Sequence, residues 1–316
     1  MPEVGRRILI TGAAGFLGEA TLEYLTRDSA NFVVAVDVNP TRGPAGETRR
    51  FVSVIRDVTQ PVDDLLDDYS IDTVIHLAFM LQAQRDPDHA RAVNVGATDA
   101  LLASCSRTRL RQFVYLSSAT VYGAHKSNSR PFVETDPANP VKGFTYSEHK
   151  AEAERLVLQF GETHPECAIS ILRGCVVMGP GSSNFITDSL GLKVLPVPAG
   201  ANPEMQFLHV DDYCATVGAV LMNGSRGIFN IAGSGTISWR EMVKLAGGRA
   251  VPVPAMALRS LTDMTWKLGL QRRSTGVGIS FIQYPWLVST EKLEQQTDWK
   301  PRHSSEQAVR SWASSR

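Results

Sequence analysis

The stretch Arg7-Ile-Leu-Ile-Thr11-Gly-Ala-Ala-Gly15-Phe-Leu-Gly18 joins a short apolar run to a turn that is rich in glycine. The apolar run predicts a buried strand, and residues 15–26 predict a helix because apolar side chains recur on one of its faces. Glycines at such a turn let the backbone approach a phosphate closely, and the N-terminus of the following helix offers unpaired N–H groups. We therefore predict a β–α unit that can hold the pyrophosphate of a dinucleotide.

The next predicted strand, residues 32–37, ends in an acidic residue that supports this interpretation. Asp37 follows Gly18 by 19 residues, which is close to the spacing of the acid that binds the adenosine ribose in dinucleotide-binding folds. A carboxylate accepts a hydrogen bond from the ribose 2′-hydroxyl and repels a 2′-phosphate, so we predict NAD. The alternative to a dinucleotide-binding turn is an ordinary strand-to-helix turn followed by a strand that ends in Asp. A separate alternative concerns the cofactor, because Arg42 could weaken the preference for NAD over NADP.

Strands and helices continue to alternate through the first half of the chain. The alternation predicts a doubly wound parallel sheet, a Rossmann α/β fold, and the almost continuous apolar character of the strands fits a sheet covered on both faces. The predicted strands are residues 51–55, 73–77, 112–117 and 168–173, and the predicted helices are residues 62–68, 90–106 and 145–161.

After residue 174 the chain changes character and predicts a smaller, irregular C-terminal substrate lobe. Residues 174–205 are rich in Gly, Pro and Ser, and residues 249–283 are predicted to be irregular. Shorter regular elements are expected at 210–222, 228–231 and 239–245. We predict an NAD-binding domain over residues 1–174, completed by parts of 206–235, and a substrate-binding lobe made mainly of residues 175–316.

Composition excludes several classes of protein. The 316 residues include 32 basic and 32 acidic side chains, so there is no basic surface that favours nucleic acid or an anionic membrane. No apolar run approaches the length of a membrane-spanning helix, and the N-terminal residues show no signal-peptide pattern. The four cysteines are scattered along the chain, which predicts buried, reduced thiols in a cytoplasmic protein.

Tyr146 and Lys150 are four residues apart in a predicted helix and therefore share one face. An ammonium group beside a phenol favours the phenolate and is expected to lower the pKa of the tyrosine. A tyrosine of this kind can exchange a proton with an alcohol or a ketone while hydride moves. By itself the pair is also expected by chance on an amphipathic helix.

A serine pair at the end of the fifth predicted strand strengthens the assignment. Ser117 and Ser118 lie at the carboxyl edge of the sheet, where ligands of α/β proteins bind. A hydroxyl group there can orient the reacting oxygen toward Tyr146, although a serine that only forms a turn is an equal alternative.

Together these motifs resemble the extended short-chain dehydrogenases/reductases of the NAD-dependent epimerase/dehydratase family. The resemblance extends over most of the chain and is specific for the family, but it is not specific for a substrate. The matching motifs are Thr11–Gly18, Asp37, Asp57-Val58, His76-Leu-Ala78, Asn94, Ser117–Gly123, Tyr146 with Lys150, Leu172-Arg173, Gly179-Pro180, Phe207–Asp212, Gly227–Gly233 and Thr297–Pro301.

The resemblance implies a role for each matching residue. Ser118, Tyr146 and Lys150 would be catalytic, with Asn94 supporting the lysine through water, and Thr120 would line the substrate pocket. Lys150 would also hold the nicotinamide ribose. The cofactor would be bound by Gly12, Gly15, Phe16, Leu17, Gly18, Asp37, Asp57, Val58, Leu77, Ala78, Tyr146, Lys150, Cys175 and Val176. Since no partner histidine is evident for Cys175, we interpret its thiol as a packing group.

The chain departs from the nucleotide-sugar members of this family at two positions. Those members carry an arginine just before the Phe207–Asp212 motif and a second one before a proline late in the substrate lobe. This chain has Glu204-Met205-Gln206 in the first stretch and Ile282-Gln-Tyr284-Pro-Trp286 in the second, without an arginine. Neither glutamine nor tyrosine replaces the charge of an arginine on a diphosphate. Arg272 and Arg273 are alternative sources of charge. Bulky apolar residues of the lobe, Met205, Met256, Met264, Tyr284 and Trp286, also favour a site without a diphosphate.

The leading hypothesis is an NAD-dependent oxidoreductase that transfers hydride at a secondary alcohol or ketone. The alternative is a nucleotide-sugar 4-epimerase of the UDP-hexose type with tightly bound NAD. Dehydration is less favoured, because Ala119 and Thr120 stand where family dehydratases supply an acid. A cofactor sensor without catalysis is disfavoured by the retained tyrosine and lysine.

Family members often form homodimers through the helices predicted at 90–106 and 145–161, but the apolar residues of these helices could equally face the sheet.

Overall fold

The central element of the fold is a parallel sheet of seven strands. A computed structural model describes residues 5–43, 50–81, 86–271 and 274–316. The strand order is β11-β6-β5-β4-β1-β2-β3, and every neighbouring pair is parallel. The predicted doubly wound fold is therefore confirmed. The strands are β1 (Arg7–Thr11), β2 (Phe32–Asp37), β3 (Phe51–Ile55), β4 (Thr73–His76), β5 (Gln112–Ser118), β6 (Ala168–Gly174) and β11 (Gly227–Ile231).

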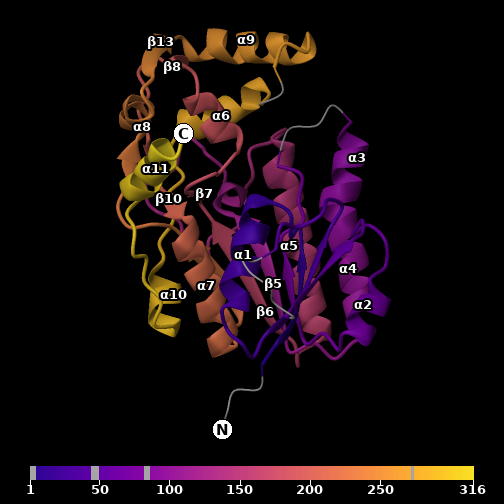
Figure 1. Cartoon of the computed structure of the whole chain (residues 1–316). Helices are drawn as coiled ribbons and strands as arrows, with labels where there is room; N and C mark the ends of the chain where they lie inside the picture. The colour runs from indigo at the N-terminus through magenta and orange to yellow at the C-terminus, as the bar shows by residue number, and fades with distance from the viewer. Residues whose placement is uncertain (1–4, 44–49, 82–85, 272–273) are drawn as a thin grey trace.

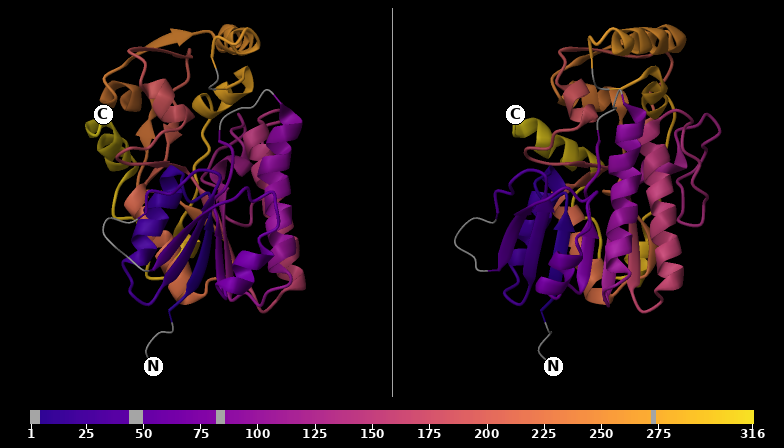
Figure 2. Two further views of the ribbon diagram at one scale, coloured as in Figure 1. Left: turned by 45° about the vertical axis from the view of Figure 1, so that its right-hand side comes forward. Right: turned by 90° about the vertical axis from the view of Figure 1, so that its right-hand side faces the viewer.

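Helices cover both faces of this sheet (Figures 1 and 2). One face carries α1 (Phe16–Thr26) and α7 (Val210–Asn223). The other carries α2 (Asp63–Asp68), α4 (Ala97–Cys105) and α5 (Thr145–Thr163). Almost all side chains of the strands are apolar, and they are buried between these layers. The sheet separates the hydrophobic core into two clusters. The sheet edge that holds the carboxyl ends of the strands faces the C-terminal part of the chain.

The helix predicted at residues 90–106 is interrupted in the structure. It consists of α3 (Pro87–Arg91), the π-helical turn η1 (Ala92–Gly96) and α4. A π-turn carries one additional residue per turn and is frequently found at functional sites. Here it places Asn94 inside the protein, where only 3% of the residue is exposed.

The C-terminal lobe is made of short two-stranded sheets and short helices. The sheets pair β10 (Phe207–His209) with β7 (Val176–Met178), β12 (Ile237–Ser238) with β9 (Glu204–Met205), and β13 (Arg249–Val253) with β8 (Val194–Pro198). The remaining elements are η2 (Ala119–Tyr122) beside the sheet, and α6 (Phe185–Leu190), α8 (Trp239–Leu245), α9 (Ala255–Lys267), η3 (Gly276–Ile282), α10 (Glu291–Gln296) and α11 (Ser305–Ser314).

The prediction that residues 249–283 are irregular is wrong. This segment contains β13, α9 and η3, and α9 extends along the end of the molecule remote from the N-terminus (Figure 1). Pro252 and Pro254 precede the helix rather than interrupt it. None of the helices described here is long and apolar enough to cross a membrane.

Candidate active site

A cavity of about 380 Å³ lies at the carboxyl ends of the strands, between the sheet and the C-terminal lobe. It brings together residues from distant parts of the chain. Its lining contains every residue predicted to bind the cofactor, and also Ser118 and Thr120. Asn94 lines a second, smaller cavity instead.

The glycine turn packs closely against neighbouring backbone, so that only glycine fits at two of its positions. Gly12 has a φ of +72°, and a Cβ atom at this position would lie 2.6 Å from the backbone nitrogen of Ala78. A Cβ atom on Gly18 would lie 2.2 Å from the carbonyl oxygen of Gly12. Gly15 precedes α1 and provides no side-chain cap, so the first N–H groups of that helix are available to a phosphate.

Asp37 is held at the end of β2 beside this turn. Its Oδ2 accepts a hydrogen bond from the backbone nitrogen of Ala14 at 3.1 Å, and its Oδ1 accepts one from Asn39 at 2.9 Å. The carboxylate therefore faces the cavity in a fixed position that suits the hydroxyls of an adenosine ribose. The Arg42 backbone donates to Glu19 at 2.6 Å. The glycine cradle and the carboxylate together fit NAD.

Ser118 and Tyr146 meet on the wall of the same cavity. Ser118 is the last residue of β5, and Tyr146 lies in the first turn of α5. A side-chain hydrogen bond from Ser118 lowers the pKa of Tyr146, but burial has the larger effect and raises that pKa to about 12. The prediction that the pKa of Tyr146 is lowered is therefore wrong for this chain, because removal from water disfavours the phenolate.

Lys150 is buried against the end of β5. Its Nζ donates to the carbonyl oxygen of Leu116 at 2.6 Å and lies 3.8 Å from the centroid of the Phe79 ring. Burial lowers the pKa of this amine to about 7. The sequence does not identify Phe79 as a partner, because this contact depends on how the loop after β4 folds over α5.

Asn94 binds the backbone of the same loop. Its Oδ1 accepts from the Met80 nitrogen at 2.7 Å, and its Nδ2 lies 3.4 Å from Nδ1 of His149. No direct hydrogen bond joins Asn94 to Lys150 in the part of the chain that the structure describes. His149 stands next to Lys150 in the sequence, but no motif there marks it as a functional residue.

Ser117 has a different role from Ser118. Its hydroxyl donates to Glu154 of α5 at 2.6 Å, and the same carboxylate accepts from the guanidinium of Arg173 on β6 at 3.1 Å. All three side chains are buried. This network ties β5, α5 and β6 together beneath the cavity, and it explains why Ser118 is the serine that reaches Tyr146.

Cys175 follows β6 and is 6% exposed. Burial raises the pKa of its thiol to about 12, so the thiol stays protonated at neutral pH and is a poor nucleophile. The other three cysteines, Cys105, Cys167 and Cys214, are also free and buried. The expected buried thiols are therefore confirmed.

The two positions that lack arginine are occupied in different ways. Gln206 forms two hydrogen bonds with the backbone of Val288, at 2.8 Å and 3.1 Å, so its amide is committed to the fold. Tyr284 packs against the core. Met205 and Trp286 are buried, whereas Met256 and Met264 are exposed on α9. Neither of these two methionines lines the two cavities described here. Arg272 and Arg273 lie outside the described residues.

A second cavity of about 90 Å³ adjoins the first at Tyr146. The two cavities share four lining residues, Met80, Leu81, Tyr146 and Phe185. Aromatic side chains form much of the smaller one, which is also lined by Asn94, Phe144, Thr145, His149, Trp266 and Ser274. Only the folded chain reveals this space, because its walls come from four separate segments.

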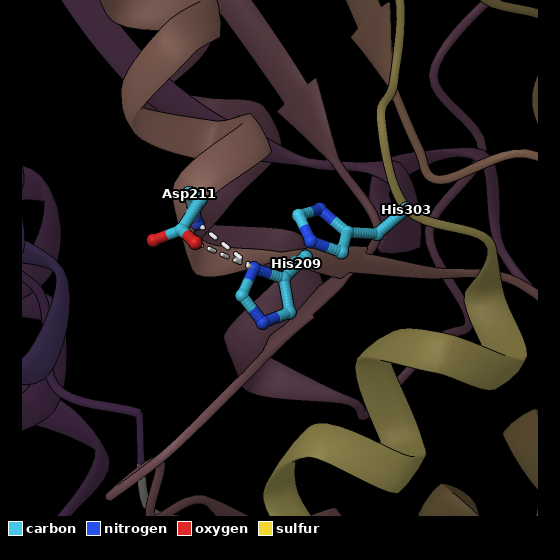
Figure 3. Close-up of side chains that lie close together, drawn as sticks. All are labelled: His209, Asp211 and His303. Carbon is cyan, nitrogen blue, oxygen red and sulfur yellow. Dashed lines mark hydrogen bonds and ion pairs between the residues drawn. The ribbon is translucent and has the colours of Figure 1, made fainter.

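A cluster of His209, Asp211 and His303 lies apart from both cavities (Figure 3). The His209 Nδ1 accepts from the backbone nitrogen of Asp211 at 3.2 Å, and Nε2 pairs with Ser311 of α11 at 3.0 Å. The rings of His209 and His303 stack with their centroids 4.0 Å apart. Both nitrogens of His209 are therefore used by the protein, and we interpret the cluster as a connection between α7 and the C-terminal segment.

A doubly wound sheet with a glycine cradle, a ribose-binding carboxylate and a Ser–Tyr pair defines an NAD-binding enzyme fold. The model of the NAD dependent epimerase/dehydratase family matches residues 8–232. The chain belongs to this family and is an NAD-dependent enzyme, so the resemblance seen in the sequence is confirmed.

Individual relatives agree with this assignment. The chain is 31% identical to the low-salt glycan biosynthesis protein Agl12 of Haloferax volcanii, over 72% of this chain and 77% of that protein. It is 27% identical to a dTDP-glucose 4,6-dehydratase of Streptomyces niveus, over 93% and 92% of the two chains. The structure of UDP-glucuronic acid 4-epimerase from Bacillus cereus, with UDP-glucuronic acid and NAD, has a TM-score of 0.76 at 22% identity and 98% coverage of both chains.

Proposed function

We propose that the protein is an NAD-dependent oxidoreductase that transfers hydride between NAD and a secondary alcohol or ketone. The observation that carries the proposal is that Ser118, Tyr146 and Lys150 line the large cavity together with the glycine turn and Asp37. The second observation concerns the stretch 204–206, where nucleotide-sugar enzymes have an arginine. Met205 is buried there, and the Gln206 amide is bonded to the backbone of Val288.

In this proposal the catalytic steps follow from side chains in the cavity. Ser118 holds the oxygen of the substrate, and Tyr146 takes its proton or returns it. Lys150 is close enough in the helix to share a face with Tyr146, and its amine interacts favourably with a developing phenolate. Bound NAD supplies the hydride acceptor. Asn94 positions the loop after β4, and Thr120, whose hydroxyl donates to Ser118 at 2.9 Å, borders the substrate.

The remaining lining residues are proposed to bind NAD. The glycine turn with Phe16 and Leu17 would hold the pyrophosphate, and Asp37 would bind the adenosine ribose. Asp57 and Val58 would contact the adenine, while Leu77, Ala78, Cys175 and Val176 would lie along the rest of the cofactor. In this organisation residues 1–174, with parts of 206–235, bind NAD, and residues 175–316 mainly bind the substrate.

The test of the proposal is Tyr146→Phe. General acid–base catalysis contributes roughly 10²–10⁴ in rate, so kcat with an accepted secondary alcohol should fall by about that factor while the Kd for NAD stays the same. Tyr69→Phe, at the end of α2 and far from the cavity, is the matched control. An unchanged kcat in Tyr146→Phe would contradict the proposal.

A nucleotide-sugar 4-epimerase is the second candidate, supported by the similarity to enzymes that are named for nucleotide sugars. It requires a diphosphate site despite Met205 and Tyr284. We would titrate UDP and UDP-glucose into NAD-saturated protein by calorimetry. Micromolar binding would place the epimerase first, and no detectable heat would favour the alcohol or ketone substrate.

We also propose a cytoplasmic homodimer. The four free, buried cysteines support a reducing compartment. Leu101, Leu102 and Val157, which are candidates for a helical dimer interface from the sequence, are buried within the chain. Leu158 of α5 remains 38% exposed. Sedimentation of the wild type and of Leu158→Arg tests the dimer, which should become a monomer in the variant.

A further inference from the structure

His149 lines the small cavity beside Tyr146. The two residues are three positions apart in α5, and residues with this spacing lie on one face of a helix, with Cβ atoms about 5–6 Å apart. A substrate whose reacting oxygen meets Tyr146 therefore brings its neighbouring atoms toward His149.

The hydrogen bonds of Asn94 determine which nitrogen of His149 carries the proton. The Met80 backbone N–H can only donate, so the side-chain atom of Asn94 that lies 2.7 Å from it must be the carbonyl oxygen. The other terminal atom is then the amide nitrogen, which lies 3.4 Å from Nδ1 of His149. Since an amide nitrogen only donates, Nδ1 accepts, and the neutral ring has its proton on Nε2.

The Nε2–H group is available to a ligand. In the part of the chain that the structure describes, no residue forms a hydrogen bond with it, and the residue is 8% exposed. The charged groups that face the ring are Glu148, Glu152 and Arg91, and the last two are paired with each other. Burial lowers the pKa of His149, which favours the neutral donor.

We propose that His149, oriented by Asn94, is a specificity-determining residue that donates a hydrogen bond to a second oxygen of the substrate. The preferred substrate is then a secondary alcohol or ketone with a hydroxyl or carbonyl group on a neighbouring carbon. This inference rests on the proposed oxidoreductase function and adds the substrate class.

The size and walls of the small cavity are consistent with a compact polar group. Its volume of about 90 Å³ is about a quarter of that of the large cavity, about 380 Å³, which suits a small group and not a nucleotide. Phe144 and Trp266 provide aromatic walls on which the carbon atoms of the substrate can pack, while His149 supplies the donor.

The experiment compares 2,3-butanediol with 2-butanol as probes for NADH formation by NAD-saturated protein. The wild type should prefer the diol by about tenfold or more in kcat/KM, because a site built around a donor rejects an analogue without the acceptor. His149→Phe should remove this preference mainly through KM for the diol. His149→Gln, which retains an N–H donor, should recover most of it. His89→Phe changes an exposed histidine on α3 and is the matched control.

A second variant tests the orientation by Asn94. In Asn94→Asp the carboxylate can only accept, so His149 must place a proton on Nδ1 and Nε2 becomes an acceptor or part of a cation. The preference for the diol over 2-butanol should change in Asn94→Asp, and NAD binding should not. Circular dichroism and the Kd for NAD show whether each variant is folded.

The outcomes separate the two proposals. If the wild type forms NADH from neither alcohol and calorimetry detects neither as a ligand, the proposed function fails, and this inference fails with it. If the wild type oxidises both with equal kcat/KM, or if His149→Phe weakens both equally, the inference alone is contradicted.

Discussion

The seven-stranded sheet and the C-terminal lobe differ in what surrounds their elements. Side chains of β1, β2 and β4 are almost completely buried, and the sheet is covered by helices on both faces. In the lobe, α9 has a single buried residue, Leu258, and exposes Met256, Leu261 and Met264. The cofactor cavity lies where these two regions meet.

This difference indicates which region determines specificity for the cofactor and which determines specificity for the substrate. The cofactor side of the cavity is made by backbone geometry and by a sheet that tolerates little change. The substrate side is made by side chains on short elements, so it can be altered with less effect on the fold. Mutations in the two regions should therefore differ in how stability and function respond.

The largest loss of stability is expected for Glu154→Ala in the sheet region. It leaves the buried guanidinium of Arg173 without its partner, which typically costs about 3–5 kcal/mol in free energy of unfolding. Glu152→Ala, two residues away, removes a partner from the more exposed Arg91 and should cost under about 1 kcal/mol. Urea denaturation measures both. Similar losses for the two variants would contradict the assigned role of the buried network.

A smaller loss is expected for Gly12→Ala. The positive φ and the contact with the Ala78 backbone together should cost about 3 kcal/mol and weaken NAD binding. Gly181, in the loop between β7 and α6, also has a positive φ of +78°, but nothing lies within 4 Å of its Cβ position. Gly181→Ala should therefore cost only about 1 kcal/mol. Equal effects would show that backbone conformation alone, and not close packing, shapes the cradle.

A pH-dependent effect is expected from Lys150. Its folded pKa of about 7 lies below the ordinary value of 10.5, so between these values the unfolded chain binds the additional proton. The free energy of unfolding should therefore rise with pH between about 7 and 10.5, and the contribution is lost as pH falls toward 7. Lys150→Met should show a flatter dependence in urea titrations. Parallel curves for the two proteins would contradict a depressed pKa.

The smallest effect is expected on the outer face of α9. Met256 is 83% exposed, so Met256→Lys should change the free energy of unfolding by no more than about 0.5 kcal/mol. Met205, in the same lobe, is 1% exposed, and Met205→Lys should lower the melting temperature clearly more than Met256→Lys because it buries a charge. Thermal denaturation of the two variants provides the comparison.

The sequence was sufficient for the parts of the fold that repeat a simple pattern. Buried parallel strands are continuous apolar runs, so β1, β2 and β4 could be located closely, and the glycine turn is defined by backbone requirements. The helix α9 was missed because its apolar residues do not face a core, and two prolines precede it. The π-turn was missed because a single additional residue leaves little trace in the apolar periodicity.

The sequence was sufficient to predict which residues line the candidate site, but not the pKa values and hydrogen-bond partners of those residues. The residues that line the large cavity follow from motifs at strand ends. The pKa values of Tyr146 and Lys150 do not, because they depend on burial by Phe79 and by the end of β5. The partners of Asn94 could not be predicted either, since Met80 reaches it through the loop after β4 and His149 through the packing of α5 against η1.

The position of β11 has a consequence for how the chain is assembled. This strand pairs with β6 at the edge of the sheet, yet residues 175–226 separate the two in the sequence. During synthesis, β6 therefore presents an open edge of backbone N–H and C=O groups until Ile231 has been made. Pairing of sequence-distant parallel strands is slow, and open edges favour association between chains. A nascent chain of this protein should be most prone to aggregation in the interval between the completion of β6 and the arrival of β11.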